Sequence, residues 1–291
     1  MAQLFDPSAY LRANPDVAKA VEEGRMRSAW AHYVSWGHRE DRPGVPGEVK
    51  ELVRSVMEAT PRTPPEKLIS RVHGTSDAGG FAQVGKMVAL DVYGAVAPHR
   101  PLGQPMRILD FGCGCGRVLP YMGILASQAD FAASDIDREA IAWCRENIRG
   151  DEGRERFAFS VNSDLPPLPF EEGSFDLVYA ISVFTHLPED MQFKWLAELE
   201  RVTAPGGLLV ISTAGAHLIR EHLGADTLRL LDEKGFYYHP FGSTDGLPDY
   251  YQAAWHTRPY VEKAWSRFLE IIDVVPLGIA GHQDLILCRR R

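Results

Sequence analysis

A glycine-rich turn gives the sequence its strongest chemical signal. An apolar run at 107–111 leads straight into residues 112–116, where glycine alternates with cysteine, and Arg117 follows. Because glycine has no Cβ, the backbone of such a turn can approach a bound ligand closely. The dinucleotide fingerprint G-x-G-x-x-G would place its third glycine at position 117, which is arginine here. The segment therefore predicts a strand, a ligand-cradling turn and a helix, with a spacing that argues against a dinucleotide.

A carboxylate follows at the end of the next apolar run. Asp135 closes the segment 131–135, and Asp110 stands in the preceding run. In nucleotide-binding α/β proteins an acid at this strand end accepts hydrogen bonds from ribose hydroxyls. Such an acid could also cap the following helix, but Asp137 is better placed for that. The two motifs together predict a nucleoside site with Asp135 as its ribose ligand.

Further segments resemble the class I S-adenosylmethionine-dependent methyltransferases, in particular methyltransferase types 11 and 25. In that family an acid precedes a G-x-G-x-G turn. Residues 162–170 are similar to its "D…LPF" segment, residues 173–188 to "FDLV…vf.Hl", and residues 199–213 to "L.PGG.l.i". The resemblance spans about residues 105–213, in the family's order. It implies S-adenosylmethionine as methyl donor and S-adenosylhomocysteine as product.

The same resemblance assigns residues to the donor. The glycine turn would hold the amino-acid end, Asp135 the ribose and Asp164 the adenine amino group. The cofactor-binding residues that it implies are Asp110, Gly112, Cys113, Gly114, Gly116, Arg117, Asp135, Ile136, Ser163, Asp164, Leu165 and Ser182. Because a sulfonium methyl is already activated, alignment of the acceptor and exclusion of water would supply much of the rate.

Motifs that the sequence lacks exclude several classes of methyl acceptor. Methyltransferases that act on nitrogens of nucleic acids or proteins commonly carry N/D-P-P-Y/F after the fourth strand, where residues 180–183 read Ala-Ile-Ser-Val. The Asp-rich metal set of catechol methyltransferases is also missing, so we expect no metal. A net charge of −8 disfavours nucleic acid, whose binding depends on clustered Lys and Arg. We therefore predict O-methylation of a small molecule or of a sugar or glycan.

Two histidines are candidates for the base that a hydroxyl acceptor needs. His186 follows the fourth predicted strand and faces the expected cofactor cleft, where it could instead have a structural role. His256 lies among aromatic residues in a later segment and has the better claim to the acceptor side. His217, His222 and His239 share that segment and are alternatives.

Aromatic residues of this later segment would suit a ring-bearing acceptor. The predicted substrate-binding residues are Tyr250, Tyr251, Trp255 and Arg258. The aromatic cluster could equally be the small core of its own segment. Its members are Phe236, Tyr237, Tyr238, Phe241, Tyr250, Tyr251 and Trp255.

Short apolar runs that alternate with helical patterns must position these motifs. This alternation is typical of a parallel sheet with crossover helices. We predict a Rossmann-like, doubly wound α/β fold with a seven-stranded, mostly parallel sheet and helices on both faces. The predicted strands are 107–111, 131–135, 157–161, 175–181, 208–212, 269–275 and 284–288.

The chain divides into two predicted parts. Residues 1–48 form a small helical module with many aromatic residues and a Pro- and Gly-rich end, and residues 49–291 form the methyltransferase domain. Within that domain, about 49–105 is a helical lid and about 214–260 a substrate-side insertion. The module resembles one attached to bacterial surface-polysaccharide and exported proteins. It would either bind a protein partner or cap the main domain.

The remaining signals concern location and competing functions. The chain's start lacks a signal-peptide pattern, and no apolar stretch approaches the length of a membrane span. The four cysteines fit loop residues in a reducing cytosol, so we expect a cytoplasmic protein. Two competing functions are a non-catalytic S-adenosylmethionine-binding or assembly protein and an NAD-dependent Rossmann enzyme. Arg117 argues against the second.

Overall fold

A mixed sheet forms the centre of the protein. The computed structural model describes residues 4–150, 156–216, 223–239 and 247–291. The main strands are β1 (Arg107–Phe111), β2 (Asp130–Asp135), β3 (Phe157–Val161), β4 (Phe175–Ala180), β5 (Thr203–Gly215), β8 (Glu270–Ile279) and β9 (Gln283–Arg289). β3, β2, β1, β4 and β5 run parallel in that order, and β9 and β8 follow in antiparallel pairs. All seven predicted strands are present, and the doubly wound, mostly parallel sheet is confirmed.

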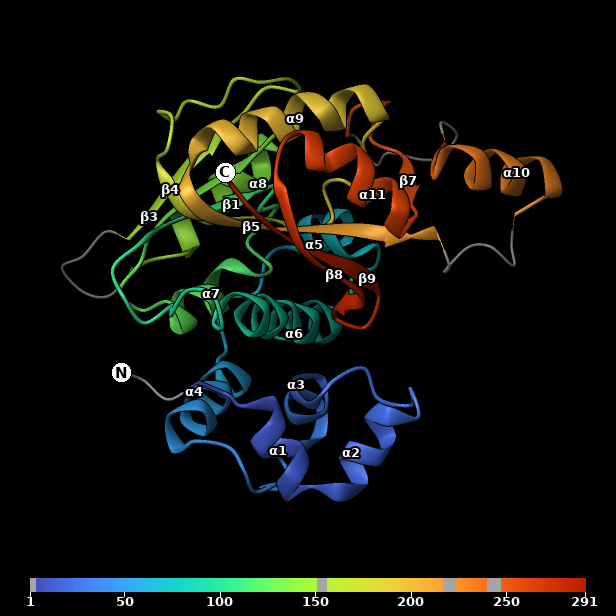
Figure 1. The fold of residues 1–291 in the computed structure, drawn as a ribbon. Coiled ribbons are helices and arrows are strands. Elements are labelled where there is room, and N and C mark those ends of the chain that lie inside the picture. The colour runs from blue at the N-terminus through green and yellow to red at the C-terminus, as the bar shows by residue number, and fades with distance from the viewer. Residues whose placement is uncertain (1–3, 151–155, 217–222, 240–246) are drawn as a thin grey trace.

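Helices cover both faces of this sheet (Figure 1). One face carries α6 (Ala78–Val96), α7 (Leu119–Leu125) and α8 (Arg138–Asn147), and the other carries α9 (Glu189–Val202) and α11 (Arg258–Ala264). Along β1, Ile108 packs in one core and Leu109 in the other. Strands buried on both faces read as continuous apolar runs, which is why the sequence revealed them.

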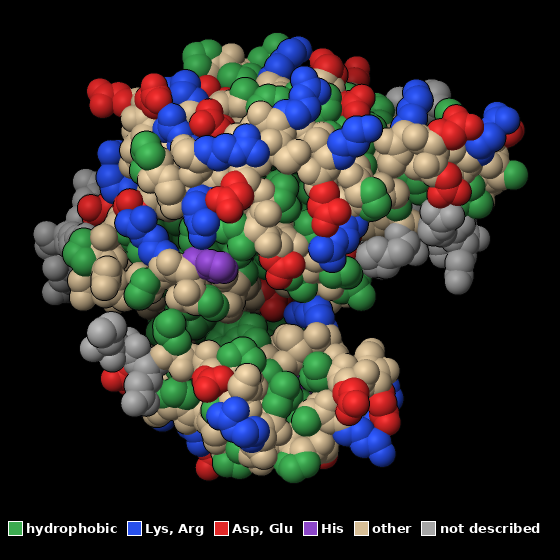
Figure 2. Space-filling model, viewed as in Figure 1, with side chains coloured by type: hydrophobic (Ala, Val, Ile, Leu, Met, Phe, Trp, Pro, Cys, Tyr) green, Lys and Arg blue, Asp and Glu red, His purple; other side chains and the backbone are tan. Residues whose placement is uncertain are grey.

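The first helices form a separate layer against α6 (Figure 1). They are α1 (Pro7–Ala13), α2 (Pro15–Glu22), α3 (Ala29–His32), the π-helical turn η1 (Tyr33–Gly37) and α4 (Gly47–Glu58). The buried rings of Tyr10 and Tyr33 pack inside this layer, while Nε1 of Trp30 donates to the Leu90 carbonyl of α6 at 2.9 Å. Figure 2 shows a hollow between the layer and the rest of the molecule, with apolar side chains on its floor.

The segment between β5 and β8 contains strands that we did not predict. None of our predicted strands falls in the insertion at about 214–260, but it holds α10 (Ala225–Lys234), β6 (Phe236–His239) and β7 (Ala253–His256). β6 pairs with β7 in the antiparallel direction, and β7 pairs in parallel with the last residues of β5. Within the described residues the sheet therefore has nine strands rather than seven. Among those residues, no helix is both long and apolar enough to cross a membrane.

Candidate cofactor and active site

A cavity lies at the carboxyl ends of β1, β2 and β4, where open α/β sheets bind their ligands. It encloses about 1010 Å³, including its open mouth. The glycine turn, the end of β2, the loops after β3 and β4, and residues 250–251 of the insertion form much of its wall. The N–H of Gly112 donates to the Ser134 carbonyl at 2.8 Å, which ties the turn to β2.

The glycine turn brings main chain, rather than side chains, to the cavity. Gly112, Cys113 and Gly114 line it. Gly112 has a φ of +77° and Gly114 a φ of +53°, a region that residues with a Cβ seldom adopt. A Cβ on Gly114 would also lie 2.7 Å from Cγ2 of Val72. Glycine is therefore needed here for conformation and for space.

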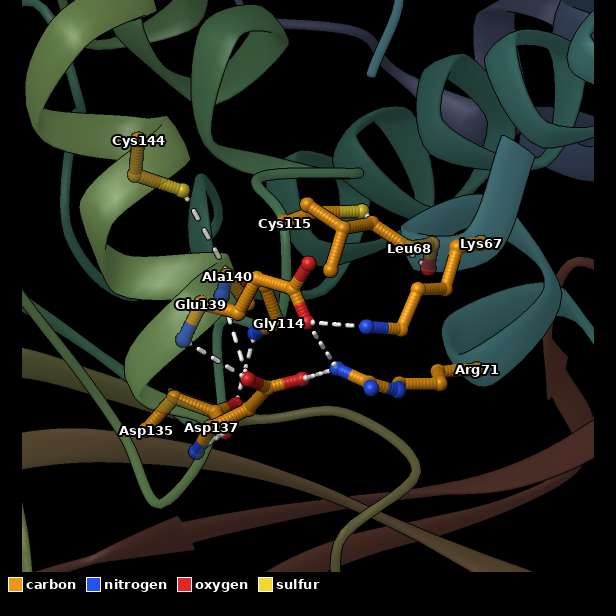
Figure 3. Close-up of polar contacts among 10 residues, drawn as sticks. All are labelled: Lys67, Leu68, Arg71, Gly114, Cys115, Asp135, Asp137, Glu139, Ala140 and Cys144. Carbon is orange, nitrogen blue, oxygen red and sulfur yellow. Dashed lines mark hydrogen bonds and ion pairs between the residues drawn. The ribbon is translucent and has the colours of Figure 1, made fainter. Parts of the chain in front are cut away.

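Asp135 lies at the end of β2 and hydrogen-bonds the backbone of this turn. One carboxylate oxygen accepts from the N–H of Gly114 at 2.7 Å, and the other accepts from the N–H of Asp137 at 2.8 Å (Figure 3). Burial raises the pKa of Asp135, while these two bonds oppose the rise. Asp137 itself caps α8 through the N–H groups of Glu139 and Ala140. The structure thus assigns capping to Asp137 and leaves Asp135 in the cavity wall.

Asp110 is buried one residue before the end of β1 and also lines the cavity. Its Oδ2 accepts from the Tyr179 hydroxyl of the neighbouring strand β4 at 2.9 Å. Burial raises the pKa of Asp110 to about 7, and the hydrogen bond from Tyr179 limits that rise. A cationic group bound in the cavity would favour the ionised carboxylate.

Arg117 brings a half-buried positive charge to the same cavity. One guanidinium nitrogen donates to the Val72 carbonyl at 3.1 Å, and another lies 3.5 Å from Oγ of Ser182. Its Nε is buried and has no hydrogen-bond partner. Burial lowers the pKa of Arg117, yet guanidinium stays charged in proteins, so an anion is the natural complement of this position.

The loop after β3 forms the opposite end of the cavity. Asp164 lies in its wall and shares a hydrogen bond with the Tyr250 hydroxyl. Asn162, the first residue after β3, also lines the cavity, and its Oδ1 accepts from the Ser134 hydroxyl at 2.7 Å. Our sequence reasoning missed Asn162, although its place after a predicted strand was a usable signal. Ile136 contributes an apolar wall nearby.

The helical segment before β1 contributes to the cavity wall. In α5 (Glu66–His73), Arg71 and Val72 belong to the cavity wall. Arg71 donates to Oδ2 of Asp137 at 2.8 Å and to Oε2 of Glu139 at 3.1 Å. Lys67 adds a 2.8 Å ion pair to Glu139 (Figure 3). These bonds fasten α5 to the start of α8, next to the turn that Asp135 holds.

His186 lies in the cavity wall on the loop after β4. Its Nδ1 lies 2.7 Å from the Gln252 carbonyl, which can only accept, so Nδ1 carries a proton. Burial lowers the pKa of His186, which keeps the ring neutral near pH 7 and leaves Nε2 as a proton acceptor. Ser182, from the same loop, lines the cavity with a φ of +61°.

The structure contradicts the prediction that His256 faces the acceptor. The side chain is 1% exposed on β7, does not belong to the cavity wall, and bonds through Nε2 to Oε1 of Gln192 at 2.9 Å. Burial lowers its pKa to about 3. A histidine enclosed in this way has no access to an acceptor. Of the alternatives, His239 ends β6 away from the cavity wall, and His217 and His222 lie outside the described residues.

Two predicted substrate residues lie off the cavity wall. Trp255 stacks on Tyr237 of β6, with ring centroids 5.7 Å apart. Arg258 pairs with Glu262 on the surface of α11. Neither belongs to the cavity wall, whereas Tyr250 and Tyr251 do. Much of the aromatic cluster is thus the insertion's own packing, and Phe241 lies outside the described residues.

Three predicted cofactor residues lie off the cavity wall. Gly116, with a φ of +81°, packs against Ile148 at the end of α8, where a Cβ would collide. Ser163 and Leu165 are exposed, Leu165 by 44%. Among the described residues, no group of three or more His, Cys, Asp or Glu side chains could hold a metal ion.

Residues 109–211 match the sequence profile of a family described as a methyltransferase domain. The match covers the glycine turn, Asp135, and the strands from the end of β1 into β5. This part of the chain is similar to that methyltransferase domain.

Individual relatives cover parts of this domain. Over 171 residues the chain is 30% identical to "Probable tocopherol O-methyltransferase, chloroplastic" of Oryza sativa subsp. japonica, a match that spans 55% of this chain and 46% of that protein. The chain spans less than half the length of the curated relatives it matches.

Two solved structures share the fold. An S-adenosylmethionine-dependent methyltransferase from Methanosarcina mazei has a TM-score of 0.50 and 20% identity, covering 66% of this chain and 96% of its own. The 1,6-didemethyltoxoflavin-N1-methyltransferase of Burkholderia thailandensis, with bound 1,6-didemethyltoxoflavin and S-adenosylhomocysteine, has a TM-score of 0.51 and 18% identity. It covers 84% of this chain and 90% of its own. At these identities the likeness concerns the fold.

Proposed function

We propose that the chain is an S-adenosylmethionine-dependent methyltransferase and that the cavity at the ends of β1, β2 and β4 binds the donor. One observation carries the proposal. A glycine turn, an Arg117 guanidinium whose buried Nε has no hydrogen-bond partner and a strand-end carboxylate on Asp135 meet in one cavity. These groups fit the donor's amino-acid carboxylate at one end and its ribose at the other.

Each part of the donor has a counterpart in the wall. Arg117 would bind the carboxylate through the nitrogen that now has no partner, and Asp110 would face the ammonium group. Asp135 would accept from the ribose hydroxyls, because a carboxylate has about four lone-pair sites and the two backbone bonds occupy only part of them. Asp164 would accept from the adenine amino group. When bound, S-adenosylmethionine supplies a methyl group already activated by its sulfonium sulfur.

His186 is the base that this arrangement supports. Its neutral ring keeps Nε2 free to accept a proton, and His186 lies in the same cavity as the glycine turn. A base is useful only if the acceptor loses a proton, so the acceptor would be a hydroxyl or a protonated nitrogen. We favour a hydroxyl of a small molecule or sugar. Glycan modification rests on the resemblance of the N-terminal module alone.

Calorimetry with S-adenosylhomocysteine tests the donor site. The wild-type protein should bind, and Asp135→Ala should weaken binding by about 1 to 3 kcal/mol, because it removes a hydrogen-bonded carboxylate. Asp130→Ala, at the other end of β2, is the matched control and should bind like wild type. Equal affinity of Asp135→Ala and wild type would remove the ribose assignment. Absence of binding to wild type would remove the proposed function.

Turnover is tested separately with S-adenosylmethionine and panels of phenols, sugars and amines. Formation of S-adenosylhomocysteine that depends on one acceptor class identifies that class. Tight donor binding with no product from any panel would favour a non-catalytic binding protein instead.

A further inference from the structure

Backbone pairing holds the loop that carries His186 against the insertion. The N–H of Gln252 donates to the His186 carbonyl at 3.1 Å, and the N–H of Ala254 donates to the Thr185 carbonyl at 2.8 Å. In return, Nδ1–H of His186 donates to the Gln252 carbonyl at 2.7 Å. The loop therefore lies along the start of β7, and its histidine ring is fixed at one nitrogen.

A buried glutamine on α9 holds the same loop from the other side. Nε2 of Gln192 donates to the carbonyls of Phe184 and Leu187 at 3.0 and 2.9 Å. Because the amide nitrogen makes both bonds, the amide oxygen must accept the 2.9 Å bond from Nε2–H of His256. His256 therefore acts as a neutral donor at the far end of a chain of hydrogen bonds. That chain fixes the carbonyls on either side of His186.

The ring of Tyr251 sets the plane of the His186 imidazole. The two rings stack with centroids 4.3 Å apart and an interplanar angle of 20°. The Tyr251 hydroxyl donates to the Ser182 carbonyl at 3.3 Å, which ties the stacked pair to the end of β4. Both Tyr251 and Ser182 belong to the cavity wall.

We propose that Tyr251, Gln192 and His256 are positioning residues that hold His186 as one neutral tautomer, with its proton on Nδ1 and its lone pair on Nε2. This inference rests on the proposed function, since only a methyl acceptor that loses a proton needs such a base. It gives the insertion a part in catalysis beyond contact with the acceptor. It also explains why His256 is buried: it acts through Gln192 and not on the acceptor.

The proton and electron balance follows from this tautomer. The acceptor's O–H or N–H proton moves to Nε2 of His186 while the acceptor atom bonds to the methyl carbon. The electron pair of the broken carbon–sulfur bond stays on sulfur, and the proton on Nε2 later leaves to water. Protein molecules in which Nε2 of His186 already carries a proton could not accept the acceptor's proton. A mixture of the two tautomers would therefore lower the rate in proportion to the Nε2-protonated fraction.

Long-range ¹H–¹⁵N correlation of the imidazole rings reads the tautomer directly. The full-length, ¹⁵N-labelled protein is measured near pH 7 with and without S-adenosylhomocysteine, and His186→Asn and His256→Asn assign the signals. We expect one neutral species for His186 with Nδ1 protonated, and one for His256 with Nε2 protonated. A His186 ring protonated on Nε2, or a mixture of both tautomers, in the wild-type protein overturns the proposal.

Variants separate positioning from general stability. In Gln192→Leu and Tyr251→Leu, the ratio of the Nδ1-protonated to the Nε2-protonated tautomer of His186 should fall by about tenfold. This corresponds to the loss of roughly one hydrogen bond or ring stack. His256→Gln keeps a donor for Gln192 and should retain the wild-type signal, as should Tyr251→Phe. Trp255→Leu, on the neighbouring position of β7, is the control for destabilisation of the hairpin.

The outcomes distinguish this proposal from the proposed function. If Gln192→Leu and Tyr251→Leu leave the tautomer ratio unchanged, or change it no more than Trp255→Leu does, the positioning role is refuted. If the leucine variants do not fold, the tautomer of His186 in the wild type and in the two conservative variants, His256→Gln and Tyr251→Phe, still tests the proposal. Binding of S-adenosylhomocysteine is measured on the same samples, so failure of the donor site is seen independently of the tautomer.

Discussion

The unpaired guanidinium nitrogen of Arg117 allows a quantitative test of how the donor is bound. A buried donor without a partner costs about 1 to 3 kcal/mol, and a ligand carboxylate would relieve this cost while neutralising the buried charge. Charge-assisted hydrogen bonds contribute about 1.5 to 3 kcal/mol. Replacement by Arg117→Met keeps much of the aliphatic length and removes the cation. Affinity for S-adenosylhomocysteine should therefore fall by about 10- to 150-fold.

A truncated ligand makes this test specific. 5′-Methylthioadenosine has the adenosine and the sulfur of the product but no amino-acid carboxylate. Its affinity should change by less than about threefold in Arg117→Met, because it gains nothing from the guanidinium. Calorimetry on both proteins with both ligands gives the four values required. Equal losses for the two ligands would show that Arg117 only supports the cavity, and no loss for either would refute the carboxylate assignment.

Three further predictions concern stability. Gly116→Ala should destabilise the fold by about 1 to 3 kcal/mol in urea unfolding, because a Cβ would meet Ile148 at a positive φ; a change below about 0.5 kcal/mol would contradict this packing. Burial lowers the pKa of His256 to about 3. Below about pH 6.5 the unfolded chain therefore binds more protons than the folded chain, and the free energy of unfolding decreases as the pH is lowered. Relative to His256→Gln, the wild type should lose about 2 kcal/mol between pH 7 and 5, and parallel pH profiles would disprove this. Trp30→Phe should cost about 1 kcal/mol through the lost bond to Leu90 without weakening S-adenosylhomocysteine binding, and weakened binding would link the N-terminal layer to the cavity.

Inner strands of the central sheet such as β1 and β4 were predictable because they are buried on both faces. The run 107–111 ends at a glycine, and the structure places β1 at the same residues. β6 and β7 were not predictable in this way. Each has four residues, and alternation over four residues between turn-forming segments does not separate a strand from an irregular stretch. The pairing of β7 with β5 depends on contacts that are distant in sequence.

Site residues could be predicted from the sequence where they lie at the carboxyl ends of predicted strands. Asp135 reaches the cavity because it closes a parallel strand, and Asp110, one residue before the end of β1, also lines the cavity. The sequence could not show which way the side chains of the insertion face. Neighbours on a strand point to opposite sides, so Trp255 packs on β6 while His256 enters the core beneath, and neither reaches the cavity. The sequence placed His186 at the cofactor cleft, and only the structure shows that His256 is buried away from the cavity.

Co-crystallisation with S-adenosylhomocysteine tests the donor site most directly. The amino-acid portion should lie against the backbone of Gly112–Gly114, with its carboxylate on the guanidinium of Arg117 and both ribose hydroxyls on Asp135. Electron density for the nucleoside at any other place, or crystals grown at saturating ligand that show this cavity empty, would contradict the account.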